Sequence, residues 1–231
     1  MRKETIVENL NAVGERIVTC CNNCARNPAE ITLLAVSKTQ PAEAIRSVYE
    51  AGQHHFGENY LQEALQKQDR LADLDICWHF IGPLQSNKTR AVAGHFQWVH
   101  SVDRLKIAQR LSAQRPHTQS PLNICLQVNI DGEHSKSGVA PQAVAALVQA
   151  VVPLPGLRLR GLMAIPAARR DPAQQRRPFA ELARLLQALR EQFPEQPLDT
   201  LSMGMSADME MAIACGATIV RIGTDIFGVR K

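Results

Sequence analysis

The sequence predicts an α/β fold, a single-domain (β/α)8 TIM barrel with one extra helix at its N-terminus. Short apolar runs rich in branched side chains alternate with amphipathic segments, as in parallel strands joined by helical crossovers. This alternation repeats eight times, and the length of 231 residues is near the roughly 250 that such barrels need. The main alternative is an open doubly wound sheet, which needs a glycine-rich loop after its first strand, and residues 36–39, VSKT, are not one.

The extra helix is predicted within residues 1–27, packed on the barrel. Ile6, Leu10, Val13 and Ile17 recur at spacings of three and four, and the proline at 28 ends the pattern. No change of composition marks a linker farther along the chain. Residues 1–231 are therefore expected to form one domain.

The first strand is predicted at residues 31–36, which are apolar except for Thr32, and Pro41 opens a helix after it. Lys38 lies between them, at the strand end where α/β proteins bind ligands. A lysine there can lose hydration, which favours the neutral, nucleophilic amine that a Schiff base requires. The simpler alternative is a lysine whose ammonium group extends from the strand end into solvent.

The later elements follow from the same alternation. Strands are predicted at residues 54–57, 77–82, 97–102, 122–130, 157–165, 198–203 and 217–222. Helices are predicted at residues 42–51, 61–74, 87–93, 103–114, 141–151, 179–193 and 206–215. Asp103 and Ser206 are the expected N-caps of two of these helices. Residues 166–177 are expected to form an exposed loop or an irregular helix start.

Composition excludes several classes of partner. The net charge of +4, from 26 basic and 22 acidic residues, is too small to indicate nucleic-acid binding, and aromatic residues make up only 4%. No apolar run approaches the ~20 residues that span a bilayer. The N-terminus is polar rather than a signal peptide, so we expect no membrane partner and a cytoplasmic location.

No metal site is expected from the cysteines and histidines. Cys21 and Cys24 form a CxxC motif, but no second pair and no nearby histidine completes a zinc site. The histidines make no HExxH motif. His79 lies on the predicted third strand and could line either the barrel interior or the ligand site.

The carboxyl ends of the strands meet at one mouth of a barrel. The residues expected there are Lys38, Asn59, Met203, Ser206, Arg221, Gly223 and Thr224. Ser206 precedes a helix and Gly223-Thr224 follows the last strand, where main-chain N–H groups attract anions, although these residues could also serve only as a cap and a turn. Closure of the barrel places strand one beside strand eight, which brings Lys38 and Thr224 close enough to contact one small ligand. A reactive lysine beside a phosphate-binding turn suits a phosphorylated aldehyde such as pyridoxal 5′-phosphate.

Seven segments carry a resemblance to a known family. In order they are LLAVSKTQP, FGENYLQE, WHFIGPLQSNK, SKSG, GLMAIP, LSMGMSADMEMAI and VRIGTDIFG. Together they resemble the YggS/PROSC-type pyridoxal phosphate homeostasis proteins over nearly the whole chain. The resemblance implies a barrel like the N-terminal domain of alanine racemase, with the cofactor held as an aldimine.

The resemblance also implies individual roles. Lys38 matches the aldimine lysine, and Ser206, Gly223 and Thr224 match the phosphate-binding segments. Other cofactor-lining motifs contain Asn59, Met203 and Arg221. Members of the family are thought to carry or buffer the cofactor, and no robust turnover is established for them.

We therefore expect a non-catalytic pyridoxal phosphate-binding protein, with no catalytic residues, that acts as a monomer and could serve apo-enzymes that depend on this cofactor. The alternative is an amino-acid racemase. A racemase needs a second acid or base on the opposite face of the cofactor, which a second domain supplies in alanine racemases. The chain ends soon after the eighth predicted strand, so no such domain is expected, and Tyr60 is the only tyrosine near the mouth.

Overall fold

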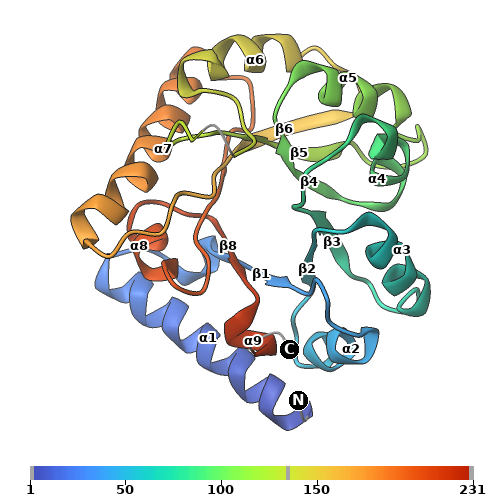
Figure 1. Ribbon diagram of the computed structural model, residues 1–231, viewed down its shortest axis with the longest axis vertical. Coiled ribbons are helices and arrows are strands. Elements are labelled where there is room, and N and C mark those ends of the chain that lie inside the picture. The colour runs from blue at the N-terminus through green and yellow to red at the C-terminus, as the bar shows by residue number, and fades with distance from the viewer. Residues whose placement is uncertain (1–2, 134–135, 229–231) are drawn as a thin grey trace.

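The computed structural model describes residues 3–133 and 136–228. Within them, eight parallel strands close into a barrel in chain order, and β1 pairs with both β2 and β8 (Figure 1). Helices form a ring around the strands. The predicted fold class is confirmed.

The bounds of the elements follow the predicted alternation. The strands are β1 (Thr32–Val36), β2 (His55–Glu58), β3 (Cys77–Phe80), β4 (Trp98–Val102), β5 (Leu122–Gln127), β6 (Leu157–Met163), β7 (Thr200–Ser202) and β8 (Ile219–Ile222). The α-helices are α1 (Lys3–Asn23), α2 (Ala42–Glu50), α3 (Leu61–Arg70), α4 (Thr89–His95), α5 (Leu105–Gln114), α6 (Val144–Val151), α7 (Pro172–Gln192), α8 (Met209–Ala214) and α9 (Thr224–Phe227). Short 3₁₀ turns lie at Pro28–Glu30, Ser86–Lys88 and Pro141–Ala143.

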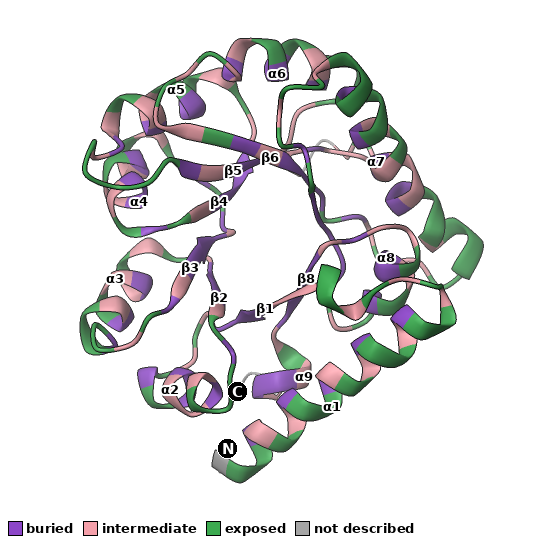
Figure 2. Cartoon of the chain, turned by 180° about the vertical axis from the view of Figure 1, so that it is seen from behind, coloured by how far each residue is buried: buried purple, intermediate pink, exposed green. Residues whose placement is uncertain are grey.

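The main core lies between the strands and the surrounding helices. Figure 2 shows buried residues on the strands and on the helix faces that look toward them. Phe56, Ile107 and Phe179 are among the largest fully buried side chains there. Truncating one such side chain to alanine typically costs about 2–5 kcal/mol, because the cavity left behind collapses only partly. No helix among the described residues is both long and apolar enough to cross a membrane.

Helix α1 covers the seam where the barrel closes. Its side chains Leu10 and Val13 are buried, and the helix contacts α2, α8 and α9. Arg16 forms ion pairs with Asp225 of α9 at 2.5 Å and with Glu210 of α8 at 2.7 Å. The extra helix therefore ties together elements that flank β1 and β8 (Figure 1).

Neither residue predicted as an N-cap has that position in the structure. The N-cap of helix α5 is Arg104 rather than Asp103, and Asp103 forms an ion pair with Arg104 at 2.7 Å. Helix α8 begins after Asp208 rather than after Ser206. The Asp208 carboxylate accepts a hydrogen bond from the main-chain N–H of Met205 at 2.6 Å, which leaves Ser206 in a turn at the barrel mouth.

Two helical segments extend beyond the prediction. Helix α7 starts at Pro172, because Asp171 caps it by accepting a hydrogen bond from the main-chain N–H of Ala173. It therefore includes part of the expected loop, with Pro178 inside the helix. The four-residue helix α9 directly after β8 was not predicted, since it is too short to show helical periodicity.

Candidate functional site

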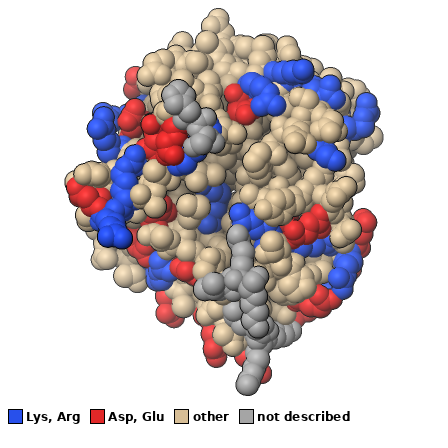
Figure 3. Space-filling view, viewed as in Figure 1, with Lys and Arg blue, Asp and Glu red and all other residues tan. Residues whose placement is uncertain are grey.

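A cavity of about 300 Å³ lies at the mouth of the barrel, where the strands end. Its lining includes six of the predicted residues, Lys38, Asn59, Ser206, Arg221, Gly223 and Thr224. Three large apolar side chains that were not predicted, those of Ile81, Ile165 and Met205, also line it. Figure 3 shows acidic and basic side chains interspersed on one face of the molecule, with basic side chains near its centre.

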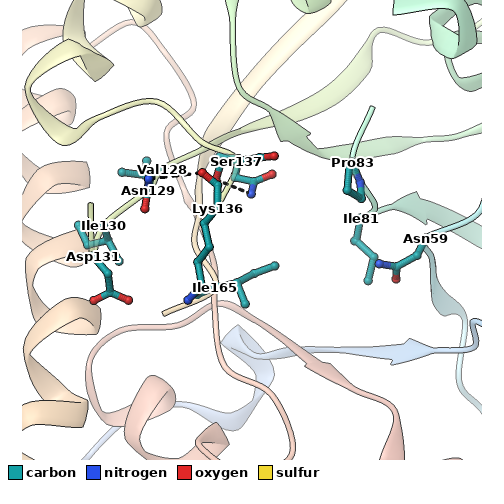
Figure 4. Close-up of a pocket in the computed structure, with 11 residues that line it drawn as sticks. Asn59, Ile81, Pro83, Val128, Asn129, Ile130, Asp131, Lys136, Ser137 and Ile165 are labelled. Atoms are coloured by element: carbon teal, nitrogen blue, oxygen red, sulfur yellow. Dashed lines mark hydrogen bonds between the residues drawn. The ribbon is translucent and has the colours of Figure 1, made fainter. Parts of the chain in front are cut away.

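A second cavity of about 320 Å³ adjoins the first and shares Asn59, Ile81 and Ile165 with it. In Figure 4, Asn59 and Ile81 face Lys136 and Ile165 across this space. The Lys136 ammonium group donates a hydrogen bond to the main-chain oxygen of Ile165 at 3.2 Å, which links the loop after β5 to the end of β6. Ser135, part of the SKSG motif, lies outside the described residues.

The closure of the barrel brings Lys38 to the end of β8. The register pairs Ala35 of β1 with Ile222 of β8, so the chain segments just beyond these residues adjoin each other. A Cβ atom at Gly223 would lie only 3.2 Å from the main-chain oxygen of Val36. Glycine thus lets the turn after β8 pack closely against β1. Lys38 and Thr224 line the same cavity although they are far apart in sequence.

A buried polar cluster supports the turn that carries Lys38. The Lys67 ammonium group donates hydrogen bonds to the main-chain oxygen of Ser37 and to the carboxylate of Glu58, both at 2.7 Å. The Ser37 hydroxyl also donates to that carboxylate at 2.7 Å. Thr39 has a positive φ of 66°, a conformation that β-branched residues rarely adopt, so the chain turns sharply after Lys38.

Glu58 is fully buried, and burial raises the pKa of its carboxyl group, although the Lys67 charge acts in the opposite direction. One carboxylate oxygen, Oε2, has no hydrogen-bond partner among the described residues. Removing the partner of a buried charge destabilises the folded protein, so the Glu58 carboxylate depends on the ammonium group of Lys67. The sequence analysis did not find this support, because its members come from different elements.

The turn after β7 also depends on a glycine. Gly204 has a φ of 94°, and a Cβ atom there would lie 2.6 Å from the Cβ atom of Ala212. Gly204 therefore directs the chain from β7 toward Ser206 at the mouth. At the neighbouring strand, the first N–H groups of α9 lack intrahelical partners and adjoin the cavity at Thr224.

Arg221 is 5% exposed, and its guanidinium group extends from β8 toward β7 and the end of β6. It donates to the main-chain oxygen of Ser202 at 2.5 Å, to the Ser202 hydroxyl at 2.9 Å and to the main-chain oxygen of Ala164 at 2.9 Å. Burial lowers the pKa of Arg221 to about 10, so the group remains charged at neutral pH. It supplies a fixed positive charge to the lining of the cavity.

Two predicted residues do not line the cavity. His79 is fully buried in the barrel interior, where its ring nitrogens contact His55 and His100, both at 2.9 Å. Met203 is fully buried in the hydrophobic core, and Met205 lines the cavity instead. Both differences arise because alternation along a strand, rather than nearness to its end, decides which way a side chain points.

The sequence analysis missed the apolar part of the cavity lining, which consists of Ile81, Ile165 and Met205. Each follows a strand by one to three residues, so its position after a predicted strand was the signal that could have found it. Ile165 and Met205 are each 39% exposed, which is high for large apolar side chains in a folded protein. Apolar side chains beside convergent polar groups are typical of small-molecule sites.

Comparisons with known proteins agree with this architecture. Residues 9–231 match the family model of the alanine racemase N-terminal domain. The chain is 61% identical to the pyridoxal phosphate homeostasis protein of Pseudomonas aeruginosa, over 98% of this chain and 96% of that protein. It is 51% identical to the protein of that name from Escherichia coli K12, over 97% of both chains.

Solved structures are similar over almost the whole chain. PipY of Synechococcus elongatus with pyridoxal phosphate bound is 39% identical, with a TM-score of 0.84, over 96% of this chain and 100% of that one. Alanine racemase from Corynebacterium glutamicum, at 17% identity and a TM-score of 0.74, shares the fold over 99% of this chain and 62% of its own. The chain therefore belongs to the alanine racemase N-terminal domain family, within the group of pyridoxal phosphate homeostasis proteins.

Proposed function

We propose that the protein binds pyridoxal 5′-phosphate covalently at Lys38 and serves the homeostasis of this cofactor without catalysing a reaction on it. The observation that carries the proposal is the single cavity that contains both Lys38 and the Gly223-Thr224 turn. An amine and an anion-binding turn in the lining of one small cavity suit one phosphorylated aldehyde. The bond would form between Lys38 Nζ and the aldehyde carbon as an aldimine, with loss of water.

The other lining residues fit this ligand. The hydroxyl groups of Ser206 and Thr224 and the N–H groups at the start of α9 can donate to a phosphate. Ile81 and Ile165 offer an apolar surface for an aromatic ring. The side-chain oxygen Oδ1 of Asn59 is buried and has no hydrogen-bond partner among the described residues, which indicates a ligand group beside it.

The relatives support the same ligand. The curated proteins that are 61% and 51% identical are named for pyridoxal phosphate homeostasis, and the similar PipY structure contains this cofactor. We extend the ligand and the role to this chain on that basis. We also propose that the protein is a cytoplasmic monomer with a single domain over residues 1–231. The proposed recipients of the cofactor are apo-enzymes that depend on it.

A specific observation favours a carrier over a racemase. A racemase needs a second proton donor or acceptor on the opposite face of the substrate carbon. Tyr60, the tyrosine expected nearest the mouth, is 56% exposed and does not line either mouth cavity. Tyr49 lies on the outer helix α2, where its hydroxyl oxygen accepts a hydrogen bond from the main-chain N–H of Asp75.

Borohydride reduction of the loaded protein followed by peptide mass spectrometry tests the binding mode. We expect one pyridoxyl adduct per chain at Lys38, and none in Lys38→Ala. Lys136→Ala is the matched control, because Lys136 lines the adjoining cavity and its loss should leave the Lys38 adduct unchanged. An adduct mapped to Lys136 would contradict the assignment of the site.

Amino-acid turnover tests the proposed role separately. When the loaded protein is incubated with many equivalents of D- or L-alanine, we expect no conversion of either enantiomer into the other. Sustained racemisation that disappears in Lys38→Ala would establish the racemase alternative while leaving the covalent site intact.

A further inference from the structure

The base of the barrel, at the opposite end from Lys38, contains a cluster of metal-ligating side chains. His55 and Cys77 are the first residues of β2 and β3, and His79 lies two residues farther along β3. The Nδ1 atom of His55, the Sγ atom of Cys77 and the Nε2 atom of His79 all lie within 4.8 Å of one another. These residues play no part in the proposed cofactor site.

The strand register explains why the three side chains converge. His55 pairs with Cys77 across β2 and β3, so their side chains project from the same face of the sheet. His79 follows Cys77 by two residues and shares that face. The Nε2 atom of His79 lies 2.9 Å from His55 Nδ1 and 3.5 Å from Cys77 Sγ, so it is central to the group.

We propose that His55, Cys77 and His79 form a zinc(II) site at the base of the barrel, with water in the fourth coordination position. Two imidazole nitrogens and one thiolate form a ligand set that zinc accepts, and the softness of the thiolate disfavours magnesium and calcium. Tetrahedral ligands at the usual zinc distances lie about 3.3–3.6 Å apart. The separation of Cys77 Sγ and His79 Nε2, 3.5 Å, falls in this range, and that of His55 Nδ1 and His79 Nε2, 2.9 Å, is a few tenths of an ångström shorter.

Neighbouring groups hold the central ligand in a binding orientation. The Nδ1 atom of His79 lies 2.9 Å from Nε2 of His100, and Nδ1 of His100 lies 2.7 Å from the Ser202 hydroxyl oxygen. The ring of Trp98 stacks on His79 at 5.4 Å, with 7° between the planes. A hydrogen bond to the second imidazole nitrogen is typical of metal-binding histidines, because it fixes the tautomer and the ring orientation.

Metal binding at this site requires the loss of one proton. Burial lowers the pKa values of His55 and His79, so both rings are neutral at pH 7 and each can offer a lone pair. Burial raises the pKa of Cys77 to about 12, so its thiol is protonated before metal binds. Binding replaces the S–H bond with a zinc–sulfur bond and releases one proton to solvent.

Solvent reaches this end of the barrel. His55 and Cys77 are half-buried, and Trp98, which covers His79, lines an open cavity of about 510 Å³ at the base. Arg160, whose guanidinium group lies 4.9 Å over the Trp98 ring, is neutralised by an ion pair with Asp199 at 2.5 Å. The partial exposure of His55 and Cys77 leaves these two ligands within reach of solvent.

Competition titration of chelator-treated protein against a chromophoric zinc chelator tests the site. We expect one zinc per chain, with affinity reduced by at least about 100-fold in Cys77→Ser and in His55→Gln, since even loss of a supporting group costs 10–100-fold. Zinc should also raise the thermal midpoint of the wild type but not that of either variant. Circular dichroism at the same concentrations checks that both variants are folded. If one variant is unfolded, the zinc affinity of the other tests the proposal.

Two control variants separate this site from the remaining thiols and imidazoles. His54→Gln removes the neighbouring exposed histidine, whose ring packs on Tyr49 instead, and should leave zinc affinity unchanged. Cys24→Ser alters a half-buried thiol of the CxxC motif and should also have no effect. Cobalt(II), used as a spectroscopic probe, should give a thiolate charge-transfer band in Cys24→Ser but not in Cys77→Ser.

Three results would overturn the proposal. The wild type could take up no zinc at micromolar concentrations, which would leave the cluster as a hydrogen-bonded group only. Equal affinity in the wild type and Cys77→Ser would place the ion elsewhere. Uptake of copper(I) without zinc would refute the choice of metal.

Discussion

The ammonium group of Lys67 lies 2.7 Å from the main-chain oxygen of Ser37, the residue that immediately precedes Lys38. The same group lies 2.7 Å from the fully buried carboxylate of Glu58 at the end of β2. A helix residue therefore holds together the ends of two barrel strands. The position of Lys38 depends on this contact, because the turn begins at Ser37.

Lys67→Met should destabilise the fold and weaken cofactor binding together. It leaves Glu58 buried without its cation, a change that typically costs about 3–5 kcal/mol. Urea denaturation of the apo protein measures the loss of stability, and a spectroscopic titration with pyridoxal phosphate measures binding. Lys106→Met, at an exposed position on α5, is the control and should change neither quantity.

Gly204→Ala should destabilise the protein, because the residue has a φ of 94° and a Cβ atom would lie 2.6 Å from Ala212. Backbone strain of this kind costs about 1–3 kcal/mol. The matched control is Gly94→Ala in α4, where a Cβ atom meets nothing within 4 Å and stability should stay equal or rise. Equal urea midpoints for the two variants would refute the packing argument.

Stability should fall as the pH is lowered from 6.5 toward 5. Burial lowers the pKa of His100 to about 3 in the folded protein, so only the unfolded chain binds a proton over this range. The contribution of neutral His100 to the free energy of unfolding is complete above pH 6.5 and decreases by up to about 1.4 kcal/mol per pH unit below it. His100→Gln should show a shallower slope of unfolding free energy against pH, whereas His117→Gln, at an exposed position, should keep the wild-type slope.

Thr224→Val and Ser206→Ala should weaken binding of pyridoxal phosphate but leave the binding of pyridoxal, which lacks the phosphate, nearly unchanged. A hydrogen bond to a charged group contributes about 1.5–3 kcal/mol, or roughly tenfold or more in affinity. Absorbance titrations with both aldehydes measure the difference. Ser137→Ala, in the adjoining cavity, should bind both as the wild type does, and an equal loss for both aldehydes in the first two variants would place the phosphate elsewhere.

The sequence predicted the order of the elements because buried parallel strands appear as short apolar runs. It could not place individual side chains with the same success. Met203 was expected at the mouth from its strand position, but its side chain lies in the core. For His79 the sequence left both the barrel interior and the ligand site open, and the structure places it in the interior. Helix α9 was missed because four residues carry no periodic pattern. The contact between Lys67 and Ser37 joins residues 30 positions apart, and only the fold reveals it.

The pairing of β1 with β8 has a consequence for synthesis on the ribosome. The lining of the mouth cavity is complete in a nascent chain only after Thr224 has been translated, because Lys38 comes from the start of the barrel and Thr224 from its end. A ligand that binds there stabilises completed chains and gives no such stabilisation to fragments that terminate early. Stabilisation by a ligand therefore requires a chain that contains both β1 and the turn after β8.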